Sequence, residues 1–258
     1  MPISQYFSMI DIMARMALRA DATKFFLGYI WWVLEPLLYV GVLYVVFNWI
    51  MKNRQEDFLL FLMTGKLAFV WFSKSVTQAG SSIVNGKGLV GKINVPKTLF
   101  PMAVIQEGMY RQVAVFALLF VVLMINGYAI TASWIYLVPL LIVNYVMIVA
   151  CGLIAACLVC MVRDFNPLIS LSMIFLMFTS GIFWDIRGLS DPSKTDFLLA
   201  VNPLAFILDA YRQVLMYNTP PDMIHLLTIG AGFGALVCAT VLLMRRGNQY
   251  LALKALTA

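Results

Sequence analysis

The sequence contains few charged residues. Asp, Glu, Lys and Arg make up only 12% of its 258 residues, whereas 62% are hydrophobic. Soluble domains are about half apolar and about a quarter charged, so this chain has too few polar side chains to cover a globule in water. The same composition excludes a disordered chain, a coiled coil and a collagen-like repeat. We therefore expect a protein whose main solvent is lipid.

Histidine and cysteine are also scarce, with one and four residues. Cys151, Cys157, Cys160 and Cys238 all lie in apolar runs, which argues against an extracellular disulfide framework. Cys157 and Cys160 form one CxxC pair, but a zinc site also needs a second pair or nearby histidines. The sequence predicts small apolar packing residues here and no metal site.

Motifs for catalysis or nucleotide binding are absent as well. Residues 86–92 read GKGLVGK, which has the glycine spacing of a phosphate-binding loop. Ile93 follows where that loop needs the Ser or Thr that holds Mg²⁺, and Pro96 stands where its helix should continue. No nucleophile elbow and no carboxylate pair with a histidine occurs. The sequence therefore predicts no catalytic residue and no cofactor bound by this chain.

What the chain has is long apolar runs. A membrane-spanning helix needs about 20 mainly apolar residues, and six runs qualify. They are residues 28–50, 58–76, 102–125, 134–162, 168–184 and 224–244. Their length and lack of strict alternation favour helices over a barrel. We predict an all-α integral membrane protein with six transmembrane helices, built as a single domain over residues 1–258.

The first 26 residues have a different pattern. Apolar side chains recur at helical spacing from Ile3 to Ala17, while polar residues, among them Asp11 and Arg15, share the opposite face. This pattern is typical of an amphipathic helix at the membrane interface. We expect such a helix over residues 1–26.

The distribution of basic residues predicts the orientation. If the N-terminus is cytoplasmic, eleven Lys and Arg lie inside and five outside. An excess of positive charge marks cytoplasmic loops, so both termini are expected in the cytoplasm. Two long connections then follow, a cytoplasmic loop over residues 77–101 and an external loop over residues 185–223.

The external loop is apolar for a connection. Asn202 and Pro203 match a helix N-cap followed by proline at the first helical position. Apolar residues from Leu204 to Leu215 then recur at helical spacing. We interpret the loop as re-entrant helices shielded by protein, with an amphipathic helix lying flat on the membrane as the alternative.

Charged residues also occur inside the predicted spans. They are Glu35, Lys66, Glu107 and Arg111, and such residues are costly in lipid and functional by default. Glu107 and Arg111 are four residues apart, so they can pair on one helix face. A structural pair within the bundle and a pathway for a proton-coupled carrier both fit this spacing.

Aromatic residues gather on single faces of the first two spans. The two sets are Trp32 and Tyr39 with Glu35, and Phe58, Phe61, Phe69 and Phe72. Packing against lipid or other helices explains such stripes. A channel for sugars explains them as well, because the CH groups of pyranose rings lie flat on aromatic faces. The sequence leaves both interpretations open.

Four strings carry a resemblance to a known family. Residues 27–36, LGYIWWVLEP, match an LG-x-x-W-x-x-L-x-P pattern at the entry to the first span. Residues 92–101, KINVPKTLFP, give a basic, proline-punctuated approach to the third span. The sequence Arg163-Asp164 follows the fourth span, and Asn202-Pro203-Leu204 lies in the external loop. Together they resemble the permease subunit of polysaccharide exporters of the ATP-binding-cassette (ABC) type-2 family.

The resemblance implies a function and partners. Such a permease forms the channel of an ATP-driven exporter that moves lipid-linked polysaccharide, O-antigen or capsule on undecaprenyl diphosphate, across the bacterial inner membrane. It acts as a homodimer with two copies of a separate ATPase subunit, which binds ATP and Mg²⁺.

The resemblance also implies roles for single residues. The segment that couples to the ATPase comprises Ser82, Ile83, Val84, Asn85, Lys87, Leu89 and Val90. Candidates for contact with the lipid diphosphate are Arg15, Arg19 and Lys24. The outer gate comprises Asn202, Pro203, Tyr211 and Arg212.

Three other functions stay open at this point. One is a type-2 permease for another amphiphile, such as a teichoic acid, a lipid or a drug. Another is a proton-coupled secondary transporter that uses Glu35, Glu107 and Arg111. A membrane enzyme acting on undecaprenyl phosphate is the third, although the external loops lack a pair of catalytic carboxylates.

Overall fold

The computed structural model describes residues 2–24, 26, 28–46, 57–90 and 95–257, and every regular element in these ranges is a helix. The helices are α1 (Ile3–Ala22), α2 (Trp31–Tyr44), α3 (Phe58–Asn85), α4 (Lys87–Val90), α5 (Leu99–Ile125), α6 (Leu137–Met161), α7 (Phe165–Thr179), α8 (Pro192–Val201), α9 (Pro203–Leu215), α10 (Met223–Arg246) and α11 (Asn248–Thr257). Short 3₁₀ turns, η1 (Gly28–Ile30) and η3 (Ala132–Tyr136), precede α2 and α6. The prediction of an all-α protein is confirmed.

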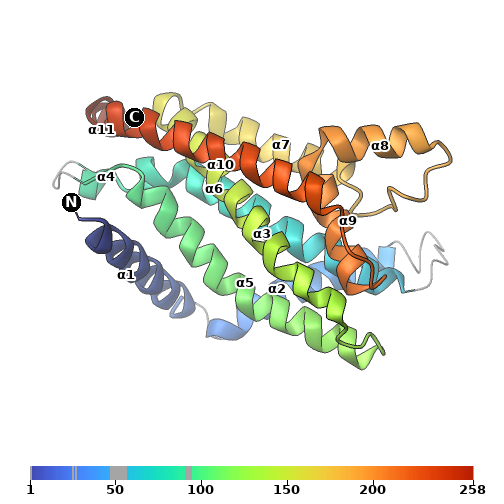
Figure 1. Cartoon of the computed structure of the whole chain (residues 1–258). Helices are drawn as coiled ribbons and strands as arrows, with labels where there is room; N and C mark the ends of the chain where they lie inside the picture. Colours follow the sequence, from blue (N-terminus) through green and yellow to red (C-terminus); the bar gives the residue numbers. More distant parts are fainter. Residues whose placement is uncertain (1, 25, 27, 47–56, 91–94, 258) are drawn as a thin grey trace.

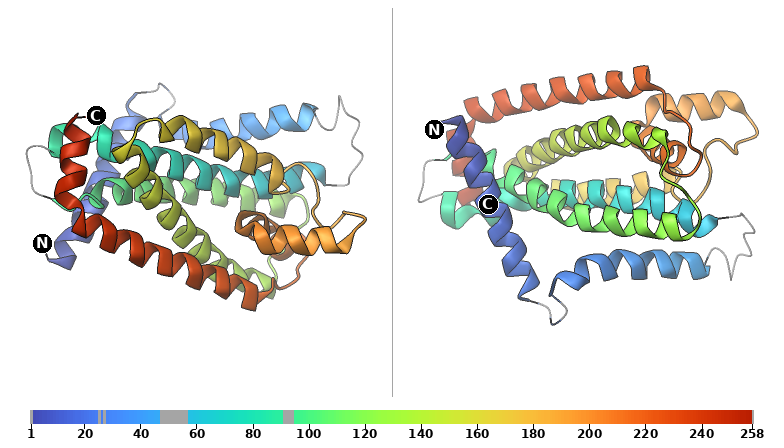
Figure 2. Two further views of the ribbon diagram at one scale, coloured as in Figure 1. Left: turned by 90° about the horizontal axis from the view of Figure 1, so that it is seen from above. Right: turned by 60° about the horizontal axis from the view of Figure 1, so that its bottom comes forward.

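The longer helices run side by side and the short ones gather at the two ends (Figure 1). Helices α4 and α11 and the start of α1 lie at one end of the bundle, and α8 and α9 lie at the other. Figure 2 shows the same division from two further directions. The molecule therefore has two distinct ends, which the site and the proposed orientation depend on.

Helix α3 forms the centre of the bundle. It packs against α5 and α6 most extensively, and also against α2, α7 and α9. Close approach of α3, α5 and α6 depends on Gly152, since a Cβ there would lie 2.8 Å from Ile105 of α5 and 3.2 Å from Ala79 of α3. Tight packing of this kind is the main attraction between helices in lipid, where apolar surfaces gain little from association.

Four helical stretches in the described residues are long and apolar enough to cross a membrane. They are Phe58–Leu89, Leu99–Ile125, Ala132–Met161 and Met223–Arg246. The bent pair α8–α9, whose helices meet at 110°, makes a fifth if it counts as one span, and the helices around α2 and α7 are apolar but shorter. The chain is a multi-pass membrane protein, and the number six stays a prediction.

Two predicted boundaries differ from the structure. The run over residues 168–184 was expected to be helical throughout, but α7 ends at Thr179 because Gly181 adopts a left-handed backbone with φ of 69°. The run over residues 58–76 continues as helix to Asn85. Its extension packs on α6, since a Cβ at Gly80 would lie 3.5 Å from Cβ of Ala155. Residues 47–50 of the first run lie outside the described residues.

Candidate functional site

A groove lies between α2, α3 and α7 and encloses about 390 Å³. We call it the α2–α3–α7 groove. Its polar lining residues are Glu35 and Tyr39 of α2, Lys66, Ser73, Lys74 and Thr77 of α3, and Ser170 of α7. The α3 members share one face because they recur at helical spacing. The groove thus combines hydroxyl groups, two lysines and aromatic surface.

The two lysines of the groove have different partners. Lys74 Nζ lies 2.5 Å from Glu35 Oε1, and both side chains are about half exposed, at 51% and 48%. Lys66 is only 3% exposed. Its ammonium lies 4.2 Å from the ring centre of Tyr39 and 3.0 Å from the sulfur of Met177. Only Lys74 is neutralised by a carboxylate of the described residues.

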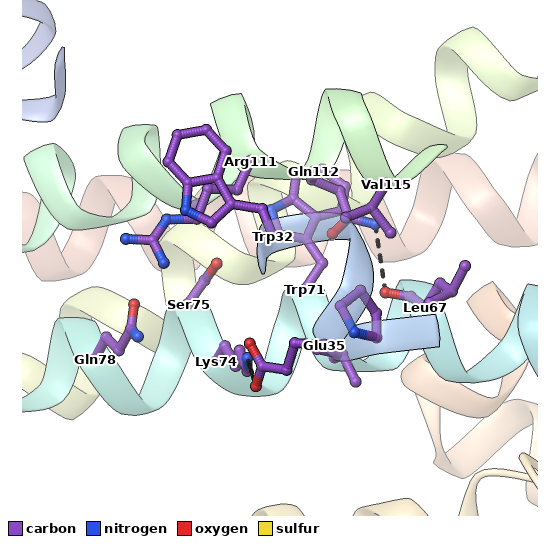
Figure 3. A pocket seen from close by; sticks show the side chains of 13 residues that line it. Trp32, Glu35, Leu67, Trp71, Lys74, Ser75, Gln78, Arg111, Gln112 and Val115 are labelled. Carbon is purple, nitrogen blue, oxygen red and sulfur yellow. Dashed lines mark hydrogen bonds and ion pairs between the residues drawn. The ribbon is translucent and has the colours of Figure 1, made fainter. Parts of the chain in front are cut away.

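A second, smaller cavity of about 60 Å³ lies between α2, α3 and α5 (Figure 3). Figure 3 shows Trp32 beside Arg111, and Glu35 facing Lys74. Arg111 Nη2 contacts Glu107 and lies 3.0 Å from Asp21 Oδ2 of α1. The ion pair expected between Glu107 and Arg111 is therefore present, and a third charge from the N-terminal helix joins it.

The N-terminal helix is fixed to α5 along its length. The Tyr6 hydroxyl donates to Thr98 Oγ1 at 2.9 Å, and the Tyr110 hydroxyl donates to Asp11. The Tyr110 hydrogen bond, together with Arg15, lowers the pKa of Asp11 below its ordinary value. These contacts join residues more than 90 positions apart, so sequence periodicity gave no signal for them.

The basic residues proposed for diphosphate contact lie on or just after α1. Arg15 Nε is 3.0 Å from Asp11 Oδ1, and Lys24 Nζ is 3.7 Å from Asp21 Oδ1. Arg19 is exposed. The role of these three residues in diphosphate contact stays a prediction.

The predicted channel aromatics have different surroundings. Phe58, Phe61, Phe69 and Phe72 are at most 4% exposed and belong to the hydrophobic core, which favours helix packing as the reason for their stripe. Phe69 and Tyr39 also line the α2–α3–α7 groove. Trp32 and Glu35 line the smaller cavity, and Glu35 borders both.

The segment predicted to couple to an ATPase has a buried and an exposed part. Ser82 and Ile83 are buried in the last turn of α3, where Val84 is partly buried and Asn85 exposed. Lys87 and Leu89 are exposed on α4, with Leu89 at 49%. Gly86 ends α3 and contacts Phe100, since a Cβ there would lie 2.7 Å from its ring. The side chain of Val90 lies outside the described part of the chain.

Asn202 and Pro203 begin α9 as predicted. Asn202 Oδ1 accepts from the N–H groups of Leu204 and Ala205 at 3.1 Å, and its Nδ2 donates to Ser180 Oγ at 3.0 Å. All residues of α9 from Leu204 to Leu215 are buried. A helix lying flat on the membrane would keep one face open, so the burial of α9 favours a re-entrant helix shielded by protein. This holds for α9 alone, because α8 has no buried residue.

The charged side chains of α9 have polar partners within the protein. Arg212 is 2% exposed and donates to the carbonyl oxygens of Gly181 at 2.7 Å and Ile182 at 3.2 Å. Its guanidinium lies 3.5 Å from the ring centre of Phe61. Gly65 makes room for it, because a Cβ there would lie 2.5 Å from Nη2. Arg212 thus joins the end of α7 to α3 and α9.

Three further contacts complete this end. Arg187, from the loop before α8, donates to both carboxylate oxygens of Asp209 at 2.8 to 3.0 Å, and Gln213 donates to the same group at 2.6 Å. The Asp209 hydrogen bonds raise the pKa of Arg187 above its ordinary value. Asn144 donates to the Tyr211 hydroxyl at 3.3 Å. Sequence reasoning missed the pair of Arg187 and Asp209, which the chain separates by 22 residues.

Comparison with known proteins gives relatives over most of the chain. The O-antigen export system permease protein RfbA of Myxococcus xanthus is 24% identical over 227 residues, which cover 88% of this chain and 87% of that protein. The protein of the same name from Klebsiella pneumoniae is 25% identical, over 83% of this chain and 82% of that protein. The chain is a homologue of export permeases.

A third relative widens this relationship. The polysialic acid transport protein KpsM of Escherichia coli is 26% identical over 209 residues, which cover 77% of this chain and 78% of that protein. No family model matches the permease. The relatives are transport proteins and not catalytic subunits, so the resemblance to permeases of ABC type-2 polysaccharide exporters is confirmed.

The strings that carried the resemblance lie at helix boundaries of the permease. Gly28 has a φ of 50° at the turn into α2, and Arg163 and Asp164 form the turn between α6 and α7. Asn202 caps α9. Leu27 and residues 92–94 lie outside the described ranges. The described parts of these strings therefore lie at or near the ends of helices.

Proposed function

We propose that this chain is the permease subunit of an ATP-driven exporter that moves lipid-linked polysaccharide, O-antigen or capsule on undecaprenyl diphosphate, across the bacterial inner membrane. The observation that carries the proposal is the similarity to two kinds of glycan export protein over 77% to 88% of the chain. The α2–α3–α7 groove supports it, since aromatic rings and scattered hydroxyls suit sugars.

Six membrane spans follow if the two shorter apolar helices also cross. They are α2, α3, α5, α6, α7 and α10. Helices α2 and α7 have 14 and 15 residues, and at 1.5 Å per residue each covers about 22 Å of a core about 30 Å thick. The turn η1 before α2 and the pair α8–α9 after α7 supply the remaining depth in this arrangement.

Both termini then lie in the cytoplasm. The start of α1 and the helices α4 and α11 share one end of the bundle, and α8 and α9 occupy the other (Figure 1). The excess of Lys and Arg assigned to the first end supports this orientation. The pair α8–α9 is then external, where Asn202, Pro203, Tyr211 and Arg212 hold the proposed outer gate in place.

A second copy of the chain completes the channel. Moving an unpaired hydroxyl group into hydrocarbon costs several kcal/mol, so a sugar chain needs an enclosed polar path. The α2–α3–α7 groove is open on one side of a single chain, and a homodimer would close two such grooves against each other. Two ATPase subunits, which bind ATP and Mg²⁺, supply the energy.

Helix α4 is the proposed docking element for the ATPase. Leu89 presents an exposed apolar side chain beside the exposed Lys87 at the cytoplasmic end. Replacing Leu89 with Asp should reduce export at least about tenfold and leave the amount of permease in the membrane unchanged. Leu256→Asp, at an equally exposed position of α11, serves as the control. Retained export in Leu89→Asp would remove α4 from the interface.

The proposal as a whole is tested in a deletion strain. We expect loss of surface glycan, accumulation of the lipid-linked polymer inside the cell, and rescue by the wild-type gene. Affinity purification of the tagged permease should bring down an ATPase subunit. Normal surface glycan in the deletion strain would overturn the polysaccharide proposal, and a purified complex stimulated only by a drug or a simple lipid would assign it to another amphiphile.

A further inference from the structure

Lys66 is the most deeply buried ammonium group of the α2–α3–α7 groove. Its side chain is 3% exposed and lies in the wall of the groove. The face of Tyr39 at 4.2 Å and that of Phe69 at 5.4 Å partly stabilise its charge. Among the described residues no carboxylate lies within ion-pair distance of it. A membrane helix that keeps an uncompensated charge usually has a functional reason for it.

The other charged groups of the groove do not neutralise Lys66. Glu35 and Lys74 face the same space, one turn or more away, and they pair with each other at 2.5 Å. That pair has no net charge, so Lys66 gives the groove a net charge of +1. The remaining close neighbour is the sulfur of Met177 at 3.0 Å. Methionine is flexible, so it can move aside when a stronger partner approaches.

The depth of Lys66 argues against an ordinary lipid headgroup as that partner. Lys66 comes eight residues after Phe58, where α3 begins, which places it about 12 Å along the helix. If α3 enters the hydrocarbon core at Phe58, the ammonium lies near the middle of a core about 30 Å thick, whereas phospholipid phosphates lie outside the core. A group carried through the groove can reach this depth.

We propose that Lys66 is an anion-binding subsite of the α2–α3–α7 groove that takes the carboxylate or phosphate of an acidic sugar in the transported glycan. This inference rests on the proposed function, because it requires a glycan to pass through the groove. Ser73, Thr77 and Ser170 supply hydroxyl groups along the same wall, which suits the neutral part of a sugar. Lys66 then selects for chains that carry negative charge.

The subsite is tested by charge-selective labelling of the assembled transporter in phosphatidylcholine nanodiscs. The four native cysteines are replaced by alanine, and Ser73→Cys places a thiol two helical turns from Lys66 on the same face of α3. The probes are an anionic sulfonatoethyl and a cationic trimethylammonioethyl methanethiosulfonate. We expect the ratio of anionic to cationic labelling rates to fall at least about tenfold in Lys66→Met, and Lys66→Arg to keep the wild-type ratio.

Competition identifies the ligand. An oligomer of sialic acid should slow anionic labelling of the Ser73→Cys thiol when residue 66 is lysine or arginine, and should have little effect in Lys66→Met. Neutral maltohexaose should protect the thiol from labelling only weakly. The double variant Glu35→Gln with Lys74→Gln removes a neutral pair and should keep the selectivity. This control separates Lys66 from the general polarity of the groove.

Three results would overturn the subsite. If both oligosaccharides protect the thiol equally and independently of Lys66, the groove binds sugars but has no anion site, and the proposed exporter function stands. If the thiol is protected only when phosphatidylglycerol replaces phosphatidylcholine, and not by the oligosaccharide, Lys66 binds a lipid headgroup. No protection by either oligosaccharide overturns the subsite together with the use of this groove by glycans.

Discussion

Two places in the bundle hold buried charge and treat it differently. On α9, Asp209 and Arg212 are 3% and 2% exposed; Asp209 accepts from Arg187 and Gln213, and Arg212 donates to the carbonyl oxygens of Gly181 and Ile182. In the α2–α3–α7 groove, Lys66 is equally buried and has aromatic faces and a thioether as neighbours. The α9 charges thus join neighbouring segments through hydrogen bonds, whereas Lys66 has no carboxylate or carbonyl partner among the described residues.

The largest loss of stability is expected from replacing Arg212. We expect Arg212→Met to lower the free energy of unfolding by about 3 kcal/mol, because buried carbonyls of Gly181 and Ile182 lose a charged donor. Thermal unfolding in detergent and the amount of protein in membranes report this loss. Arg246→Met, at an exposed arginine of α10, is the control. An unchanged midpoint would mean that Arg212 does not hold α7 to α9.

A smaller effect is expected at the second α9 contact. Asp209→Asn keeps the shape but removes the charge that pairs with Arg187, and should destabilise the protein by about 2 kcal/mol. A double-mutant cycle with Arg187→Met measures the coupling between them. Asp196→Asn, on the exposed side of α8, should have no effect. Additive single effects in the cycle would show that the pair contributes no coupling.

The half-exposed pair of the groove should contribute less to stability. Glu35→Gln is expected to change the free energy of unfolding by less than about 1 kcal/mol, because solvent screens an ion pair in which both side chains are about half exposed. The same unfolding measurement at low and high salt checks this, and the difference between wild type and variant should shrink in salt. A loss as large as that in Arg212→Met would contradict the division between the two regions.

The smallest effect, and one of opposite sign, is expected at Lys66. Lys66→Met removes a buried ammonium that has no carboxylate among the described residues, so stability should stay within about 1 kcal/mol of wild type or rise. Export of an acidic glycan should fall in the same variant while export of a neutral one continues. Strong destabilisation would place Lys66 with the structural charges of α9.

Much of the helical framework followed from the sequence. The N-cap at Asn202 was predicted because the capping interaction joins residues only two and three positions apart. The pairing of Glu107 with Arg111 also followed from spacing on one helix. The end of α7 did not, because the hydropathy of residues 180–184 continues that of the helix while Gly181 turns the backbone.

The candidate site was predictable only in part. The aromatic stripe of α3 was visible, but that its rings are buried in the core and that only Phe69 among them also borders the groove depends on which neighbours cover each ring. The N-terminal helix was expected from its amphipathic pattern, yet its attachment to α5 through Tyr110 and Arg111 was not. Such contacts join distant positions, and a single sequence carries no periodic signal for them.

The long apolar runs of the sequence are enough to predict that this protein lies in lipid and is helical. In lipid the backbone must satisfy its hydrogen bonds internally, and a helix does so within one segment. Tertiary structure decided which buried charges have oxygen acceptors as partners. Packing α9 against α3 and α7 encloses Arg212 among carbonyl groups, whereas packing α2 and α7 beside α3 leaves Lys66 at the wall of a groove. Both side chains are basic and buried, and only the surroundings that the fold assembles distinguish them.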